Sequence, residues 1–208
     1  MDRNDNVIRS AAGSVGTELD AAKPAGVRMR STEQGTVAME QSEVSSIDSR
    51  ALRYALGRFA SGITVISGMV DNVPTGFTCQ SFYSVSLNPP LVSFCVMKTS
   101  KSWPSIRLSR RFTVNVLAEE QQAISDAFAK SGSEKGKHVD WAAHLGGKAV
   151  IAKTLMWLDC SLHSEHELGD HFLIIGKVEE MSPVDWDRQR NPLIYFRGQY
   201  RQLLSQSA

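Results

Sequence analysis

Short segments with the residue pattern of β-strands recur along this chain, and they constrain its fold more than any other feature. They are rich in Val, Ile, Thr and aromatic residues, and Gly, Pro, Asn or Asp bound them, as is typical of strands and turns. The segments are 62–67, 91–97, 112–117, 155–163, 171–178 and 193–196. A polar turn at 71–74 joins the first of them to the stretch that begins at Gly76, which predicts a hairpin.

Helical patterns are fewer, and they do not alternate regularly with the strands. The expected helices are 49–59 capped by Ser49, 103–109 capped by Ser102, and an amphipathic helix at 119–130. The polar segment 131–148 is predicted to be a surface loop. Because this order is unlike a doubly wound fold, the predicted fold class is mostly β with peripheral helices, as an antiparallel barrel or sheet.

The aromatic residues divide the chain into an aromatic-free leader and a folded part. All eight Phe, four Trp and four Tyr residues lie between Tyr54 and Tyr200, and residues 1–46 contain none. Such a segment buries too little apolar surface to offset the chain entropy lost on folding. We therefore expect a disordered or loosely ordered leader at 1–46, one folded domain at 47–204 and a short tail at 205–208.

Composition argues against several partners. A net charge of +1 provides no field for nucleic acid, and the pair Arg110-Arg111 is interpreted as a solvated face. No apolar run reaches the roughly 18 residues of a membrane span. Cys79, Cys95 and Cys160 are odd in number and widely spaced, which favours buried thiols in a reducing, cytoplasmic setting. We expect neither a nucleic-acid nor a membrane partner.

The stretch GFTCQSFYSVSLNPP, residues 76–90, carries small polar side chains where a sheet normally packs its core. These side chains are Thr78, Gln80, Ser81, Ser84 and Ser86. Pro89 and Pro90 end the stretch, since proline cannot donate ladder hydrogen bonds. The polar positions are either the solvent face of an antiparallel strand or the donor edge of a ligand site.

A second polar group, residues 99–102 (TSKS), directly precedes the predicted helix at 103–109. Hydroxyls, the cation Lys101 and a helix N-terminus together suit a single phosphate. A capped helix with an exposed lysine explains the same residues, and local sequence favours that simpler explanation. The segment 132–138 imitates a phosphate loop, but it has the wrong glycine spacing and ends in His.

Two further clusters are weaker candidates for chemistry. His163 and His166, with Glu167, Asp170 and His171 nearby, resemble a metal site, yet strand alternation places 163 and 166 on opposite faces. Polar turn residues between two strands are the simpler interpretation, so no metal site is predicted. None of the serines lies in a Gly-x-Ser-x-Gly elbow, which argues against a serine hydrolase.

Seven stretches between about residues 52 and 203 carry a family resemblance when taken in order. They are RYALGRFASGITVIS, VPTGFTCQSFYSVSLNPPLVSFCV, TSKSW, RFTVNVL, WLDCSL, GDHFLIIGKVE and PLIYFRGQY. Together they resemble the flavin reductase-like family, the reductase components of two-component flavin-dependent monooxygenases. The resemblance covers nearly the whole folded region, and its specificity comes from the combination of stretches.

The resemblance implies a split β-barrel flavin-binding fold, normally a homodimer with flavin near the subunit interface. The implied flavin contacts are Pro74, Thr75, Gly76, Phe77, Thr78, Gln80, Ser81, Cys95, Val96, Met97, Lys101, Ser102, Ala127 and Phe128, with Lys101 and Ser102 on the phosphate. The implied nicotinamide side is His171, Tyr195, Phe196, Arg197 and Gly198. His171 would orient the nicotinamide or stabilise developing charge, and its alternative is a histidine that caps a turn.

The function that the resemblance implies is an NAD(P)H:flavin oxidoreductase. FMN or FAD would receive a hydride, and the reduced flavin would diffuse to a partner oxygenase. Because the sequence lacks an evident arginine cluster for a 2′-phosphate, NADH is favoured over NADPH. Two alternatives stay open: a flavin-binding or flavin-sensing barrel without turnover, and a barrel oxidase with bound flavin, for which no substrate pocket is identified.

Overall fold

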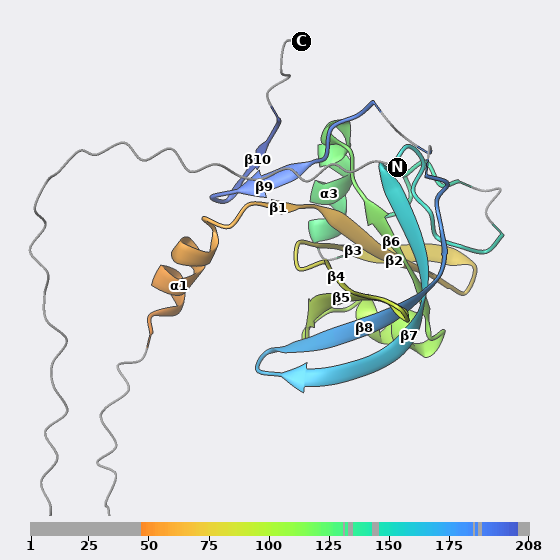
Figure 1. Ribbon diagram of the computed structural model, residues 1–208, viewed down its shortest axis with the longest axis horizontal. Helices are drawn as coiled ribbons and strands as arrows, with labels where there is room; N and C mark the ends of the chain where they lie inside the picture. Colours follow the sequence, from red (N-terminus) through yellow and green to blue (C-terminus); the bar gives the residue numbers. More distant parts are fainter. Residues whose placement is uncertain are drawn as a thin grey trace, which may run out of the picture. The chain divides into compact units, whose positions relative to one another are not determined.

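The computed structural model describes residues 47–130, 132, 135–142, 146–184, 186 and 189–203. The leader predicted at 1–46 and the tail predicted at 205–208 lie outside these residues. The described strands form a seven-stranded sheet and a three-stranded sheet (Figure 1). The mostly β class predicted from the segment pattern is confirmed.

The seven-stranded sheet is antiparallel throughout, with the strand order β3-β2-β6-β7-β8-β5-β4. Its strands are β2 (Thr64–Val70), β3 (Val73–Cys79), β4 (Tyr83–Leu87), β5 (Pro90–Met97), β6 (Arg111–Val116), β7 (Met156–Leu168) and β8 (His171–Met181). The predicted hairpin joins β2 to β3 through Asp71 and Asn72, which both have positive φ angles of 49° and 61°. Asp and Asn tolerate this left-handed conformation better than most residues, so they suit the turn.

The three-stranded sheet has the order β1-β9-β10, with β1 (Ser61–Gly62), β9 (Ile194–Phe196) and β10 (Gln199–Arg201). The single strand predicted at 62–67 is therefore divided between the two sheets. The break falls at Ile63, whose N–H donates to the Leu193 carbonyl (3.1 Å) and whose carbonyl accepts from the Leu117 N–H (3.0 Å). One β-branched run thus connects both sheets, because a buried strand pattern does not specify its partner.

The helices are α1 (Ser49–Leu56), α2 (Trp103–Leu108) and α3 (Gln122–Ala129), and the short 3₁₀ helix η1 (Glu119–Gln121) precedes α3. Of the two predicted caps, Ser49 was wrong, whereas Ser102 occupies the N-cap position of α2 as predicted. The Asp48 carboxylate, not Ser49, accepts the first free N–H groups of α1, from Arg50 and Ala51. At α2 the Ser100 hydroxyl accepts from the Trp103 N–H (3.3 Å), while Ser102 makes no capping bond. None of the described helices is long and apolar enough to cross a membrane.

Aromatic side chains form the centre of the main core. The Phe94 ring packs edge-on against Phe112 (5.3 Å between centroids) and Trp103 (5.5 Å), and Phe77 joins the same cluster. Edge-to-face pairs at these distances are favourable beyond the area that they bury. A second core, which includes Phe128, lies between α3 and the three-stranded sheet. The aromatic cluster holds α2 and strands β3, β5 and β6 together.

The seven-stranded sheet closes on itself without a backbone ladder. Its edge strand β3 approaches β5, which is next to the opposite edge strand β4, and the described residues form no β3–β5 pairing. Just after β3, the Ser81 hydroxyl accepts from the Cys95 N–H of β5 (2.8 Å) and donates to the Cys95 carbonyl (3.3 Å). The result is a barrel with a split between β3 and β5, as the sequence resemblance implied.

Strands β7 and β8 form a hairpin that is longer than predicted (Figure 1). The predicted strand ended at residue 163 with polar turn residues after it, but residues 164–168 continue β7, and only Gly169 and Asp170 make the turn. A register shift between Leu162 and Ser164 marks a bulge in β7. Polar residues are stable in this extension because its side chains are mostly exposed or half-buried, so one face of the hairpin is solvated.

Replacing Gly176 of β8 with alanine should destabilise the barrel. The added Cβ would lie 2.4 Å from Cζ of Phe112, a ring that the aromatic cluster prevents from moving. We expect a loss of about 1–3 kcal/mol in the free energy of unfolding, which is typical of overpacked cores. Thermal or urea unfolding would measure it. Gly62→Ala is the matched control, because no atom lies within 4 Å of its added Cβ; equal stability of the two variants would contradict the prediction.

Candidate active site

A cavity of about 450 Å³ occupies the split of the barrel. Its walls come from the end of β3 and the residues after it, the end of β5, the turn at 99–102, the end of α3, Lys135 and His171. We call it the split cavity. It forms there because β3 and β5 approach each other without pairing, so the space between them stays open.

The split cavity brings together most of the residues predicted to contact flavin. Those that line it are Phe77, Thr78, Gln80, Ser81, Cys95, Val96, Met97, Lys101, Ser102 and Phe128. Gly76 and Ala127 are not among its lining residues, whereas Ala129 and Lys130, which the sequence did not indicate, are. Pro74 and Thr75 line a second cavity of about 640 Å³, here called the hairpin cavity, along the β2–β3 turn.

The hydroxyl groups that made the 76–90 stretch unusual mostly bond within the protein. Thr78 Oγ1 donates to the Ser125 carbonyl of α3 (2.6 Å), and Ser81 Oγ bonds the backbone of Cys95. These two hydroxyl hydrogens are therefore committed to holding the cavity walls. Every second N–H of the edge strand β3 points away from β2, so donors for a bound ring come from the backbone and from the exposed Gln80 side chain.

Two lysines lie where the split cavity meets the hairpin cavity. Lys101, Ser102 and Lys135 line both cavities. Within the described residues, neither lysine pairs with an acid and the Ser102 hydroxyl makes no hydrogen bond. Burial lowers the pKa of the Lys135 amino group, because an uncompensated charge is disfavoured there. A bound anion would compensate both cations.

Lys135 is the functional candidate that sequence reasoning missed. It belongs to the segment 132–138, whose glycine spacing does not fit a phosphate loop. The tertiary structure places it in the wall of the split cavity by a different route, since it follows α3 in the chain and α3 packs on β3. In the sequence, only a cation between Gly132 and Gly136, just after an amphipathic helix, could have indicated this residue.

A third cavity, of about 690 Å³, adjoins the split cavity. We call it the helix cavity because α1 contributes much of its wall, together with Asp170, Tyr195 and Gly198. Gln80 and His171 line both the split cavity and the helix cavity. His171, Tyr195 and Gly198, three of the residues predicted for the nicotinamide side, are thus brought together.

Phe196 and Arg197, the other two residues predicted for the nicotinamide side, line none of the three cavities. The Arg197 guanidinium lies 5.0 Å from the centre of the Phe196 ring. The Arg197 N–H donates to the Gly57 carbonyl at the end of α1 (2.8 Å). Arg197 therefore connects the β9–β10 turn to Gly57, which itself lines the helix cavity.

A hydrogen bond fixes the orientation of the His171 imidazole. His171 Nδ1 lies 2.6 Å from Oδ1 of Asp170, and an ionised carboxylate can only accept, so Nδ1 carries the proton. This bond, followed by the charge of His171, lowers the pKa of the Asp170 carboxyl. Nε2 is left as the imidazole nitrogen that is free to meet a ligand. His171 lies opposite Met97 of β5, which places it beside the split.

The cysteines differ in their surroundings. Cys79 and Cys160 are buried, and burial raises the pKa of both thiols, that of Cys160 to about 12. Cys95 is only half-buried and lines the split cavity, so the prediction of a buried thiol fails at this position. The Cys79 thiol lies 3.4 Å from the Ser81 hydroxyl and belongs to the same closure of the split.

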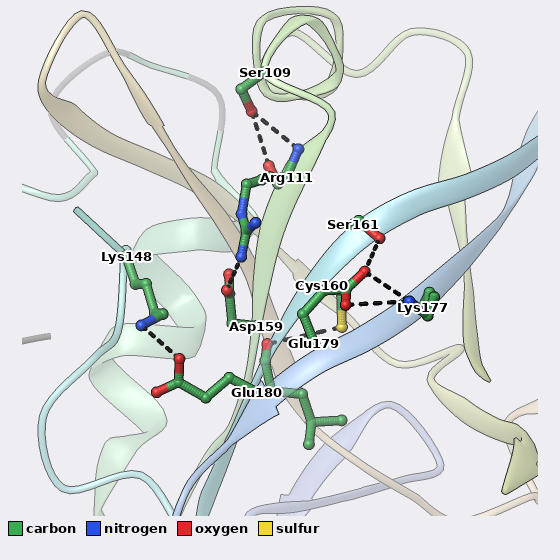
Figure 2. A network of polar contacts seen from close by, with 10 residues as sticks. Ser109, Arg111, Lys148, Asp159, Cys160, Ser161, Lys177, Glu179 and Glu180 are labelled. Carbon is green, nitrogen blue, oxygen red and sulfur yellow. Dashed lines mark hydrogen bonds and ion pairs between the residues drawn. The ribbon is translucent and has the colours of Figure 1, made fainter. Parts of the chain in front are cut away.

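Figure 2 shows a separate polar network on β6, β7 and β8. Arg111 pairs with Asp159, whose side chain is only 4% exposed, and this pairing raises the pKa of the Arg111 guanidinium. Arg111 is therefore more than a solvated residue, since it neutralises a buried carboxylate. Lys148 pairs with Glu180 nearby (2.9 Å). None of these residues lines the split cavity.

The histidines at 163 and 166 both belong to β7 and are exposed. The Ser164 hydroxyl lies 3.0 Å from Nε2 of His166. Among the described residues, no group of three or more His, Cys, Asp or Glu side chains could hold a metal ion.

Comparisons with known proteins agree with this geometry. The family model described as "Flavin reductase like domain" matches residues 56–204. The chain is 44% identical over 169 residues to "Flavin-dependent monooxygenase, reductase subunit HsaB" of Rhodococcus jostii (strain RHA1), which covers 81% of this chain and 83% of that protein.

Two solved structures are also similar. One is a nitrilotriacetate monooxygenase component B homologue from Mycobacterium thermoresistibile, with a TM-score of 0.72, 41% identity, and coverage of 78% of this chain and 90% of that chain. The other is the NADH:FAD oxidoreductase SgcE6 of Streptomyces globisporus in complex with NAD and FAD fragments, with a TM-score of 0.69, 31% identity, and coverage of 77% and 96%.

Proposed function

The chain belongs to the flavin reductase-like family, and we propose that it is an NAD(P)H:flavin oxidoreductase that reduces FMN or FAD by hydride transfer. One observation carries the proposal: His171 and Gln80 line both the split cavity and the helix cavity. Two ligands bound in these cavities would meet at that shared wall. Hydride transfer requires this contact, because the two reacting atoms must approach to about 3–3.5 Å.

The residues of the split cavity suit a flavin. Met97, Val96 and Phe128 offer apolar surface to a flat ring, while Gln80 and the free N–H groups of β3 offer donors to its polar edge. Lys101, Ser102 and Lys135 lie together at the cavity's junction with the hairpin cavity, where the phosphate would be bound. Of the predicted flavin residues, we retain those that line the split cavity, and we place Pro74 and Thr75 beyond the phosphate.

The helix cavity is the proposed nicotinamide side. When both are bound, the nicotinamide supplies a hydride and the flavin ring accepts it, so that the redox chemistry belongs to these two molecules. The protein binds the two molecules, orients them and excludes water from between them. His171, held by Asp170, presents Nε2 to the shared wall, and we assign it the role of orienting the nicotinamide. The described residues show no arginine cluster lining the helix cavity, which favours NADH.

We propose that the reduced flavin is released to a separate oxygenase. The Rhodococcus relative is named as the reductase subunit of a flavin-dependent monooxygenase, which supports an oxygenase partner for this chain. The split cavity opens to the surface beside exposed residues such as Gln80 and Lys130, so a flavin can enter and leave. Three cysteines without a disulfide are consistent with a reducing compartment, and we propose the cytoplasm.

A homodimer is the proposed assembly. The edge strand β4 exposes the alternating apolar residues Tyr83, Val85 and Leu87, and Leu87 is 90% exposed. The apolar side chains Leu52, Leu56 and Phe59 at α1 are exposed as well. Exposed edge strands with apolar side chains are normally covered in natural proteins. A second copy of this chain is the occupant that the family resemblance implies.

A steady-state assay tests the enzyme activity. With FMN or FAD added, the protein should oxidise NADH with a turnover number on the order of 1–1,000 s⁻¹, the usual range for enzymes, and NADPH more slowly. The decrease in NADH absorbance at about 340 nm would measure the rate of oxidation. Tight flavin binding with negligible NADH oxidation would instead identify a flavin-carrying or flavin-sensing barrel.

Truncating the lysines tests where the phosphate is bound. Lys101→Ala and Lys135→Ala should each raise the dissociation constant for FMN about tenfold, since each removes one charge-assisted contact. Turnover at saturating flavin should fall by a smaller factor than the FMN affinity does. Riboflavin, which lacks the phosphate, is the matched control, and its dissociation constant should not change. Flavin fluorescence titrations would report both constants, and an equal weakening of riboflavin would refute the phosphate role.

Sedimentation equilibrium tests the assembly. The wild-type protein should have twice the mass of the chain, and Leu87→Glu should shift it towards the monomer, because the charge would be buried at the β4 edge. Val184→Glu is the matched control, since Val184 is 87% exposed and lies in the turn after β8, outside the strands. A monomeric wild-type protein would rule the homodimer out.

A further inference from the structure

The β9–β10 hairpin is bonded to α3 through the hydroxyl of Tyr200. Tyr200 OH donates to Oδ1 of Asp126 (2.8 Å) and lies 2.9 Å from Oγ of Ser125. Because the Tyr200 proton goes to Asp126, the Ser125 hydroxyl must be the donor in the second bond. Burial raises the pKa of the Tyr200 hydroxyl, so it keeps its proton near neutral pH. The order of donors is therefore Ser125 to Tyr200 to Asp126.

Ser125 carries this connection into the wall of the split cavity. Its side chain is fully buried, and its carbonyl accepts the hydrogen bond from Thr78 Oγ1 of β3 (2.6 Å). One residue of α3 therefore binds the hairpin through its hydroxyl and β3 through its carbonyl. Buried polar groups that are all hydrogen-bonded define a single arrangement of the elements that they join.

Both elements that the network joins line the split cavity. Thr78 lies on one wall, and Phe128, Ala129 and Lys130, at the end of α3, lie on another. The Tyr200 ring also packs edge-on against Tyr195, with 5.2 Å between centroids, and Tyr195 lines the helix cavity. The hairpin thus contacts the helix cavity directly and the split cavity through α3.

We propose that Tyr200 is a positioning residue of the split cavity, whose hydroxyl holds α3 against β3 in the spacing that flavin binding requires. Tyr200 lines none of the three cavities, so the proposed role acts through α3. The ligand assignment rests on the proposed flavin reductase function. The network itself is carried by the three hydrogen bonds among Thr78, Ser125, Tyr200 and Asp126.

Tyr200→Phe in the full chain is the direct test, because it removes only the hydroxyl. We expect the dissociation constant for FMN to rise about tenfold, with kcat at saturating flavin changed less than threefold. The dissociation constant for riboflavin should rise by the same factor as that for FMN, since the variant alters the spacing of the cavity walls and not the phosphate contact. This pattern differs from that of Lys135→Ala. An FMN dissociation constant within twofold of wild type would overturn the proposal.

A matched control separates positioning from general destabilisation. Thr154→Val removes another buried hydroxyl, which donates to the Ile151 carbonyl (3.3 Å) and lies outside all three cavities. It should lower the melting temperature without changing the FMN dissociation constant. If Thr154→Val weakens FMN binding as much as Tyr200→Phe does, the effect comes from lost stability and the proposal is wrong.

A double-mutant cycle supplies a second readout. Ser125→Ala should also raise the dissociation constant for FMN. The double variant Ser125→Ala/Tyr200→Phe should raise it by less than the product of the two single fold-changes, because both residues belong to one network. Purely multiplicative effects would overturn the proposal. If Tyr200→Phe does not fold, Asp126→Ala provides the same test from the half-exposed end of the network. Failure of the wild-type protein to bind any flavin would instead overturn the proposed function.

Discussion

The hydrogen bonds between Ser81 and the backbone of Cys95 are the interaction on which the rest of the site depends. A closed ladder between β3 and β5 would satisfy their backbone groups but would leave no space between the strands. The Ser81 side chain instead bridges the two strands where they approach, and they stay unpaired along the rest of their length. The split cavity and the free edge of β3 both follow from this closure.

The same constraint explains why some polar residues around the cavity bond within the protein while others stay available to a ligand. The hydroxyls of Thr78 and Ser81 hold the walls, since an open split lacks the ladder that would otherwise fix them. The residues left for a ligand are those without partners among the described residues, such as Gln80, Ser102 and the two lysines at the junction of the cavities. His171 stands at the other end, held by Asp170, where two cavities share a wall.

Much of the fold could be predicted from the sequence, because strand patterns and turn residues are local signals. The β2–β3 hairpin, the strands at 91–97 and 112–117 and the amphipathic helix before Lys130 all appear close to where they were expected. The errors occur where partners decide the outcome. Ile63 divides one strand between two sheets, and residues 164–168 extend β7 because β8 pairs with them. Neither partner can be identified from the local pattern.

The sequence by itself determined the mostly β class and, through ordered family stretches, most of the residues that line the split cavity. It also limited the partners that charge and hydropathy allow. Only the tertiary structure decided which hydroxyls serve the fold, that Lys135 joins Lys101, and that Tyr200 reaches α3. Composition and spacing describe neighbours along the chain. These contacts join residues about 34 to 75 positions apart, and packing alone brings them together.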